Sequence, residues 1–323
     1  MKKKLAFGFI VIVLLLVAAY LLFPEILLNL ARDVERRSSG LAKKEARVDD
    51  HQIVYLEGGK GETILLLHGY GGDKDNWTRF AKYLTQDYHV LIPDLPGFGE
   101  SSKLSTENYD IENQMRRMDR FTEVLKLGRF HVAGHSMGGT IAAVYGARHP
   151  QKVLTLALIA PAGLKSPQKS EFAKLLEKGI NPFLVSTPDE YEKLISYLFV
   201  KPPPIPAPIK VALAAQKISQ MAFNEKILKD IRKAHLSLEL FLPDIHAPVL
   251  IIWGDTDKIL DVSCVSILER KLKNSRTVIM KEMGHVPILE RPQETATFYL
   301  DFLKNTADES SRSDSDRLLR KTR

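Results

Sequence analysis

Cysteine is nearly absent from this chain, which has a single one, Cys264, among 323 residues. One cysteine excludes an internal disulfide framework, and none stands near the N-terminus to carry the lipid of a bacterial lipoprotein. The nine histidines are scattered, and neither C-x-x-C nor H-E-x-x-H occurs in the sequence. We therefore expect no metal site.

A basic stripe interleaved with aromatic residues is also missing, although the formal net charge is +7. Much of the excess lies at the two ends of the chain, which indicates surface and membrane-proximal charge and excludes a nucleic-acid footprint. No obligate protein partner is evident. The hydrophobic fraction of 45% is enough for a domain with one large core.

Charge and proline are both absent from residues 5–23, which follow three lysines. This run is about as long as a helix that crosses the hydrocarbon core of a bilayer. A cleaved signal peptide, the alternative, would have a shorter apolar stretch and an A-x-A-like site. We predict a single-pass transmembrane anchor over residues 1–30 and a charged juxtamembrane linker, helical in part, over residues 31–50. Basic residues flank both sides of the anchor, so the membrane face of the remaining chain stays undecided.

Strand-like and helix-like segments alternate over residues 51–163 and again over residues 244–305. The fully apolar run at residues 62–69 is typical of a strand buried in a parallel sheet. It is followed by a helix-like segment at residues 73–86 that opens with an aspartate cap. This alternation predicts an α/β fold with a mostly parallel sheet and helices on both faces.

The alternation is interrupted between residues 164 and 243, where the pattern is helix-like and irregular. The sequence KPPPIPAP at residues 201–208 is stiff and cannot be helical. Because the interruption falls between two strands, we expect a mostly helical cap above the carboxyl edge of the sheet. Its clustered apolar residues are expected to form an acyl pocket. The polar residues 306–323 are expected to be a disordered tail.

A strand, a sharp turn and a helix surround one serine in RFHVAGHSMGGTIAAVYG, residues 129–146. The turn has the pattern G-x-S-x-G, which forces Ser136 into a strained backbone conformation that small neighbours must accommodate. Gly134, Gly138 and Gly139 are those neighbours. The hydroxyl group of Ser136 then lies at the carboxyl end of a strand and at the start of a helix. A nucleophilic serine requires this placement.

A serine hydroxyl needs a base to remove its proton at pH 7, and His285 is the candidate. It directly follows a predicted strand, in a Gly-His pair near the C-terminus, and loops at that edge of the sheet meet in space. His135 is expected to pack beside the nucleophile. The base needs a carboxylate, and the loop after VLIIWG offers Asp255, Asp257 and Asp261. We choose Asp257, which lies in the loop itself, while the other two are expected to shape the turn and to begin the next helix.

Two N–H groups must stabilise the negative charge that develops on the carbonyl oxygen of an ester. One is expected from the backbone of Met137, at the start of the helix. The other is expected from the glycine-rich loop at residues 68–72, with Tyr70 as the best candidate. The glycines of this loop let its backbone approach a substrate closely.

Several segments together resemble those of a known superfamily, the α/β-hydrolases, over about residues 50–305. The segments are HGYGGDKDNWTRFAKYL (68–84), DLPGFGESS (94–102), GHSMGG (134–139), WGDTDKILDVS (253–263) and GHVPILERP (284–292). Within the superfamily, the chain resembles cold-active bacterial lipases of the Moraxella and Psychrobacter type and the membrane-anchored monoacylglycerol lipases of animals. The KPPPIP segment also resembles the cap of the bacterial members.

This resemblance implies an α/β-hydrolase fold and the hydrolysis of carboxylic esters of acylglycerols, with no cofactor. It implies Ser136, Asp257 and His285 as the catalytic triad, in the chain order of these enzymes. It also implies Tyr70 and Met137 as oxyanion donors. The expected partners are a lipid or other ester substrate and, through the apolar N-terminal run, the bilayer.

Other functions remain as alternatives at this point. Dehalogenases and epoxide hydrolases share the scaffold but use an aspartate nucleophile, so Ser136 argues against both. Carbon–carbon bond hydrolases of ring-cleavage products keep the serine triad, but they are usually soluble, and the predicted anchor argues against them. A catalytically inactive, membrane-tethered binding protein is a third possibility, which an intact triad disfavours.

Overall fold

The computed structural model describes Phe7 and residues 23–321, with side chains described up to residue 308. In this part of the chain, eight strands form one sheet in the order β1-β2-β4-β3-β5-β6-β7-β8. The pairs β1–β2 and β2–β4 are antiparallel, and all other neighbours are parallel, which confirms the predicted mostly parallel sheet. The strands are β1 (Leu41–Val48), β2 (His51–Gly58), β3 (Thr63–Leu67), β4 (His89–Pro93), β5 (Phe130–His135), β6 (Val153–Ile159), β7 (Val249–Gly254) and β8 (Ser275–Met280).

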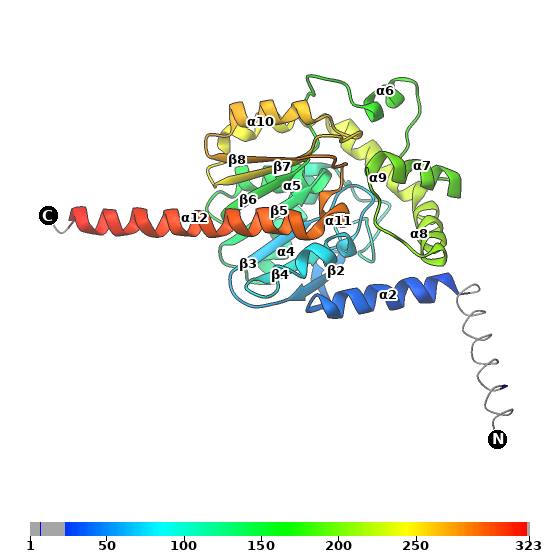
Figure 1. The fold of residues 1–323 in the computed structure, drawn as a ribbon, viewed down its shortest axis with the longest axis horizontal. Helices are drawn as coiled ribbons and strands as arrows, with labels where there is room; N and C mark the ends of the chain where they lie inside the picture. The colour runs from blue at the N-terminus through cyan, green and yellow to red at the C-terminus, as the bar shows by residue number, and fades with distance from the viewer. Residues whose placement is uncertain (1–6, 8–22, 322–323) are drawn as a thin grey trace.

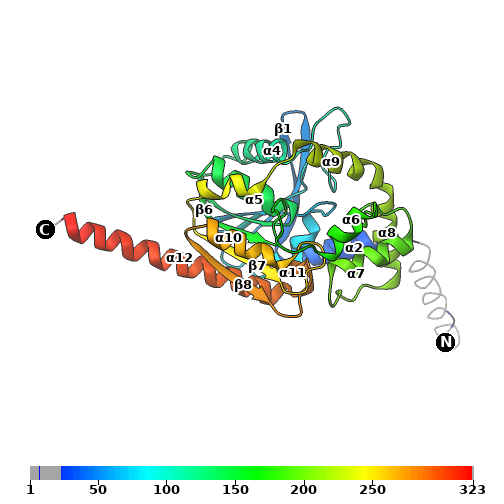
Figure 2. The same ribbon diagram turned by 90° about the horizontal axis from the view of Figure 1, so that it is seen from above.

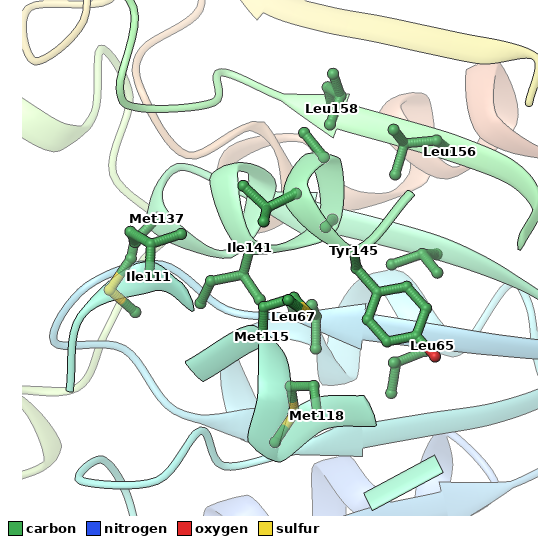
Figure 3. Close-up of a cluster of buried hydrophobic side chains, with 14 of the residues drawn as sticks. Leu65, Leu67, Ile111, Met115, Met118, Met137, Ile141, Tyr145, Leu156 and Leu158 are labelled. Atoms are coloured by element: carbon green, nitrogen blue, oxygen red, sulfur yellow. The ribbon is translucent and has the colours of Figure 1, made fainter. Parts of the chain in front are cut away.

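Helices cover both faces of this sheet, because the central strands are apolar on both sides (Figures 1 and 2). In β3, Leu65 and Leu67 belong to the core on one face, and Ile64 and Leu66 belong to the core on the other. Figure 3 shows the first of these cores, where side chains from α4 and α5 meet those of β3 and β6. The helices of the sheet layers are α3 (Thr78–Ala81), α4 (Ile111–Val124), α5 (Met137–Arg148), α10 (Val265–Lys271), α11 (Pro287–Glu290) and α12 (Pro292–Lys321).

The N-terminal segment differs from the prediction, because residues 31–50 are not a linker. Helix α2 (Pro24–Ser38) packs against the body of the protein, and strand β1 pairs with β2 along its whole length. The two strands are joined at Asp49 and Asp50, and Asp49 has a positive φ of 52°, as in a tight hairpin turn. The charged side chains in the middle of β1 are exposed at the sheet edge. That exposure explains why the strand's composition is typical of a linker.

The predicted transmembrane run at residues 5–23 lies outside the described residues, apart from Phe7 and Phe23. Of the helices that the structure does describe, none has the length and apolar character needed to cross a bilayer.

The C-terminal segment also differs from the prediction, because residues 306–321 continue α12 as one helix. The start of this helix packs in the core, and its C-terminal part projects away from the rest of the molecule (Figure 1). No proline or glycine follows Pro292, so nothing in the sequence stops the helix. Low apolar content alone was therefore a poor predictor of disorder here.

Between β6 and β7 lies the segment predicted as a cap, and it is largely helical. Residues 201–206 of its proline-rich stretch have no regular secondary structure, but Ala207 and Pro208, which were also predicted to be non-helical, begin the next helix, because a proline is tolerated in a first helical turn. The segment packs beside α2, since α2 contacts α8. The cap elements are α6 (Glu171–Glu177), α7 (Pro188–Leu198), α8 (Ala207–Ser219), α9 (Met221–Ala234), η2 (Leu238–Leu240) and η3 (Leu242–Asp244).

Candidate active site

Ser136 is the residue at which β5 turns into α5, and its backbone is strained, with φ 53° and ψ −120°. Neighbouring glycines permit this turn. A Cβ on Gly134 would lie 2.2 Å from the carbonyl oxygen of Gly138, and one on Gly138 would lie 2.3 Å from that of Leu67. Any side chain at either position would push the turn apart. The strain is of the kind found at functional sites, where it holds a side chain in place.

His285 and Asp257 form a buried pair behind the elbow. The Nδ1 atom of His285 lies 2.8 Å from Oδ2 of Asp257. The other carboxylate oxygen, Oδ1, accepts hydrogen bonds from the N–H groups of Ile259 and Leu260, at 2.8 and 2.9 Å. Because these bonds fix the carboxylate, His285 donates from Nδ1 and keeps Nε2 free to accept a proton.

The other two aspartates of this loop have separate partners. Asp261 accepts from the N–H of Ser263 and caps η4 (Val262–Cys264). Asp255 accepts from the hydroxyl of Thr256. Of the three candidates, Asp257 alone is hydrogen-bonded to His285 in the part of the chain that the structure describes.

The glycine-rich loop lies directly beside the nucleophile. A Cβ on Gly69 would be 3.2 Å from the Cβ of Ser136, so this backbone approaches as closely as glycine allows. The buried His68 holds the loop, since Nδ1 donates to the carbonyl of Gly69 and Nε2 accepts from the N–H of Leu95. Burial lowers the pKa of His68 to about 4, and the imidazole is therefore neutral, as these two bonds require.

His135, inside the elbow, contacts the backbone of His285. Its Nε2–H donates to the backbone carbonyl of His285 at 2.7 Å. Burial lowers the pKa of His135 to about 3, so the ring is neutral and serves as a donor. The geometry agrees with the expected packing role and adds a hydrogen bond that the sequence did not reveal.

Ser136, His285 and Tyr70 line one cavity of about 510 Å³. Most of its other lining is apolar and comes from the cap. Examples are Phe183, which lies in the loop before α7, and Leu213, which lies on α8. The described residues contain no group of three or more histidine, cysteine, aspartate or glutamate side chains arranged to hold a metal ion.

Helix α2 supplies a wall of this cavity, which sequence reasoning missed. Leu28, Ala31, Arg32 and Glu35 all line it. Their spacing of three and four residues places them on one face of a helix, and this spacing could have been recognised in the sequence. The adjoining apolar run masked it, because the whole segment was interpreted as anchor and linker.

Ion pairs fix α2 in this position. Arg36 donates to both carboxylate oxygens of Asp75 at 2.7 Å, and Arg32 donates to Asp73 at 3.0 Å. Burial opposes the charge of Arg36, but its bonds to Asp75 and the negative charge there raise the pKa of Arg36 above its usual value. A bidentate arginine–carboxylate pair of this kind is rigid.

Known proteins share both this sequence and this fold. A family model for the alpha/beta hydrolase fold matches residues 62–191. A monoacylglycerol lipase of Bos taurus is 32% identical over an alignment of 321 positions, which covers 94% of this chain and 94% of that protein. This chain belongs to the α/β-hydrolase family. Lipase 1 of Psychrobacter immobilis is 35% identical over 276 residues, covering 83% of this chain and 86% of the lipase.

Among solved structures, a membrane phospholipase A described as a bacterial virulence factor has a TM-score of 0.88 and 45% identity. The match covers 95% of this chain and 99% of the other. With these relatives, the α/β-hydrolase described here is a serine ester hydrolase of the lipase type. The predicted resemblance is confirmed. These names favour ester hydrolysis over carbon–carbon bond cleavage and over an inactive binding protein.

Proposed function

We propose that this α/β-hydrolase is a membrane-anchored lipase that cleaves acylglycerol esters through an acyl-enzyme on Ser136. The observation that carries the proposal is the buried His285–Asp257 pair, which shares a largely apolar cavity with a strained serine. In the first step, Nε2 of His285 removes the proton of Ser136, and Oγ attacks the ester carbonyl carbon. His285 then returns this proton to the departing glycerol oxygen.

Deacylation repeats the cycle with water. His285 removes a proton from a water molecule, the hydroxide attacks the acyl carbon, and Ser136 leaves as an alcohol with the proton restored by His285. In both halves, the N–H groups of Met137 and Tyr70 would bind the negatively charged oxygen. The close approach of Gly69 to Ser136 supports this role, since it brings the loop that carries Tyr70 beside the nucleophile.

The acyl chain would occupy the part of the cavity lined by the cap, residues 164–243. Leu194, Ile195 and Leu198 of α7 line it, which suits a fatty chain. The names of the relatives support acylglycerols as the substrate class, since they include monoacylglycerol lipases.

The membrane attachment would be a single helix over residues 5–23, within an anchor of residues 1–30. The printed name of the membrane phospholipase A supports a membrane location. Helix α2 supports it as well, because the helix begins at Pro24, directly after the apolar run, and lines the cavity. Substrate drawn from a bilayer would then have a short path to Ser136.

Serine-directed labelling and ester hydrolysis by the full-length protein test the proposed chemistry. We expect a fluorophosphonate to label the wild type and oleoylglycerol to be hydrolysed, and Ser136→Ala to abolish both with an unchanged melting temperature. Asp257→Asn should lower kcat by roughly four orders of magnitude, because the tautomer of His285 is no longer fixed.

Asp261→Asn is the matched control for the acid, since Asp261 lies in the same loop without contacting His285, and it should keep near-normal activity. Near-normal turnover in Asp257→Asn would show that the acid is assigned wrongly. A wild type that is neither labelled nor active on any ester would refute the proposed function. Cleavage of ring-cleavage products in preference to esters would instead assign the reaction of the carbon–carbon bond hydrolases.

A further inference from the structure

The expected oxyanion donor, Tyr70, lies in a turn that its own backbone closes. The N–H of Gly72 donates to the carbonyl of Gly69 at 3.1 Å, so residues 69–72 form a four-residue turn with Tyr70 and Gly71 at its centre. Gly71 has a positive φ of 66°, which glycine adopts without strain at the third position of such a turn. The closing bond does not use the N–H of Tyr70, which is therefore available for an oxyanion.

A lysine of the cap holds this turn from another side. Nζ of Lys217, on α8, donates to the carbonyl of Gly71 at 3.2 Å. That carbonyl and the N–H of Gly72 belong to one peptide unit, so the lysine and the closing bond hold the two ends of the same unit. A Cβ on Gly71 would lie 2.2 Å from Nζ of Lys217, and any larger residue at this position would therefore displace the lysine.

The side chain of Tyr70 is fastened to the cap as well. Its hydroxyl group donates to the backbone carbonyl of Asn224, on α9, at 2.6 Å. Its ring packs against that of Phe183, with the ring centres 5.4 Å apart, and Nζ of Lys217 lies 5.9 Å from its centre. Helices α8 and α9 of the cap thus hold both central residues of the turn, α8 through Gly71 and α9 through Tyr70.

An ammonium group at this place costs free energy. Burial lowers the pKa of Lys217 to about 8, although the negative charge of Asp73 opposes this shift. Lys217 lines the same cavity as Ser136. An apolar side chain of the same length would fill the space without the cost of burying a charge. A buried cation beside a nucleophile therefore indicates a role in the reaction.

We propose that Lys217 is a positioning residue, which holds the N–H of Tyr70 in place for the oxyanion and makes the oxyanion hole depend on the cap. The inference rests on the proposed function, because it assigns a role within the same reaction. Lys217 acts through the turn and not on the ester itself. A fixed donor stabilises the transition state more than it stabilises the bound ester, so loss of the lysine should lower kcat and leave KM nearly unchanged.

Lys217→Met tests this role in the full-length protein, with 4-nitrophenyl butyrate and 1-oleoylglycerol as substrates. The substitution keeps the length of the side chain and removes the donor. We expect kcat to fall by about 10- to 100-fold on both esters, less than for the loss of a whole oxyanion donor because Tyr70 keeps its N–H. KM should stay within about twofold of the wild-type value. Lys210→Met is the control and should keep wild-type kcat, because Lys210 lies on the same helix and pairs with Glu192 at 3.0 Å.

A pair of ketones separates positioning from a general loss of structure. An alkyl trifluoromethyl ketone forms a tetrahedral adduct with the serine and carries an oxyanion, whereas the methyl ketone with the same alkyl chain binds without reacting. Lys217→Met should raise Ki for the trifluoromethyl ketone by the same factor as kcat/KM falls, and leave Ki for the methyl ketone within about twofold. Equal weakening of both would show that the lysine only supports the fold, and it would overturn the proposal. An unchanged kcat, with or without a raised KM, would overturn it too.

Chemical rescue keeps the proposal falsifiable if Lys217→Met does not fold. Lys217→Cys can be alkylated selectively in the folded protein, because Cys264, the one native thiol, is only 2% exposed. Alkylation with 2-bromoethylamine gives a lysine analogue, and iodoacetamide gives a neutral side chain. The first adduct should exceed the second in kcat by about tenfold or more, and equal kcat values would overturn the proposal. Wild type treated with either reagent is the control, and its hydrolysis of esters reports on the proposed function separately.

Discussion

At the scale of single residues, the candidate site depends on buried groups that are held in one protonation state. His68 and His135 are both neutral because burial lowers their pKa values, and each fixes a part of the backbone on which catalysis depends. His68 holds the loop that carries Tyr70, and His135 holds the carbonyl of His285. Both side chains of these histidines are committed to hydrogen bonds with the backbone, and His285 is the histidine that we propose as the base.

The low pKa of His68 makes an acid-dependent loss of stability a testable consequence. Between pH 6.5 and about pH 4, the unfolded chain binds a proton at this histidine and the folded protein does not. The free energy of unfolding must therefore fall as the pH falls through that window, by about 3 kcal/mol in all from this one group, and be unaffected by it above pH 6.5. Urea unfolding at pH 7.5, 6 and 5 measures the effect.

His68→Gln removes this titration and keeps an amide for hydrogen bonding. The variant should be less stable than the wild type at pH 7.5, since one of the two loop-holding bonds is lost. Its stability should nevertheless fall less steeply between pH 7 and pH 5. Parallel curves for the two proteins would show that His68 is already protonated in the folded state.

At the scale of elements, most of the α/β core could be predicted from the sequence. Its buried strands are continuous apolar runs, and its helices repeat apolar residues every three to four positions. The apolar run of β3 and the strand–turn–helix around Ser136 both have local signals that tertiary contacts then reinforce. Strand β1 had no such signal, since it lies at an edge and its charged residues face solvent. Helix α2 differs from the prediction because the adjoining apolar run masked its cavity-facing residues, and the C-terminal part of α12 differs because its composition is polar. The amino-acid composition of β1 does not reveal that its backbone is hydrogen-bonded to β2.

The link between α7 and His285 could not be predicted, because it joins residues that are far apart in sequence. Glu290 accepts hydrogen bonds from the N–H groups of Gly284, Val200 and Lys201, at 3.2, 3.2 and 2.7 Å. The N–H of His285 itself donates to the carbonyl of Leu198, at the end of α7. The loop of the base is thereby fastened to the cap.

Glu290→Ala should therefore impair catalysis without touching a reacting group. Losing three acceptor contacts lets the His285 loop shift, and a displacement of about 1 Å costs on the order of 10²-fold in kcat. KM for a short-chain ester should change little. Glu294→Ala is the control, since Glu294 is an exposed residue nearby whose ion pair is with Arg291. Wild-type kcat in Glu290→Ala, measured on a folded variant, would show that the loop keeps its position without these bonds.

At the scale of the whole molecule, the N-terminal boundary of the catalytic domain decides which shortened chains can fold. A variant that begins at Pro24 keeps α2 and β1, and we expect it to leave the membrane fraction and to hydrolyse short esters. A variant that begins at Asp49 lacks both, so Asp75 loses its pair with Arg36 and the cavity loses a wall. Strand β2 also loses its pairing with β1 and becomes an open sheet edge, and we therefore expect this variant to aggregate.

Fractionation with a carbonate wash and thermal unfolding test these expectations. The full-length protein should stay with the membrane after the wash, whereas the variant from Pro24 should be released and melt cooperatively. Release of full-length protein by carbonate would argue against a spanning anchor. Recovery of a species shortened by about twenty residues from the native host would identify residues 5–23 as a cleaved signal.

Helix α2 has a consequence for how this chain can vary. Connections between an anchor and a catalytic domain usually tolerate insertions and deletions, because nothing depends on their length. One residue inserted within α2 would rotate everything before it by about 100°, since a helix has 3.6 residues per turn. Leu28 and Ala31 would then point away from the cavity, although Arg36 could keep its pair with Asp75. Relatives that place this helix in the same way should therefore differ freely in the sequence of the anchor while keeping the number of residues between it and β1 constant.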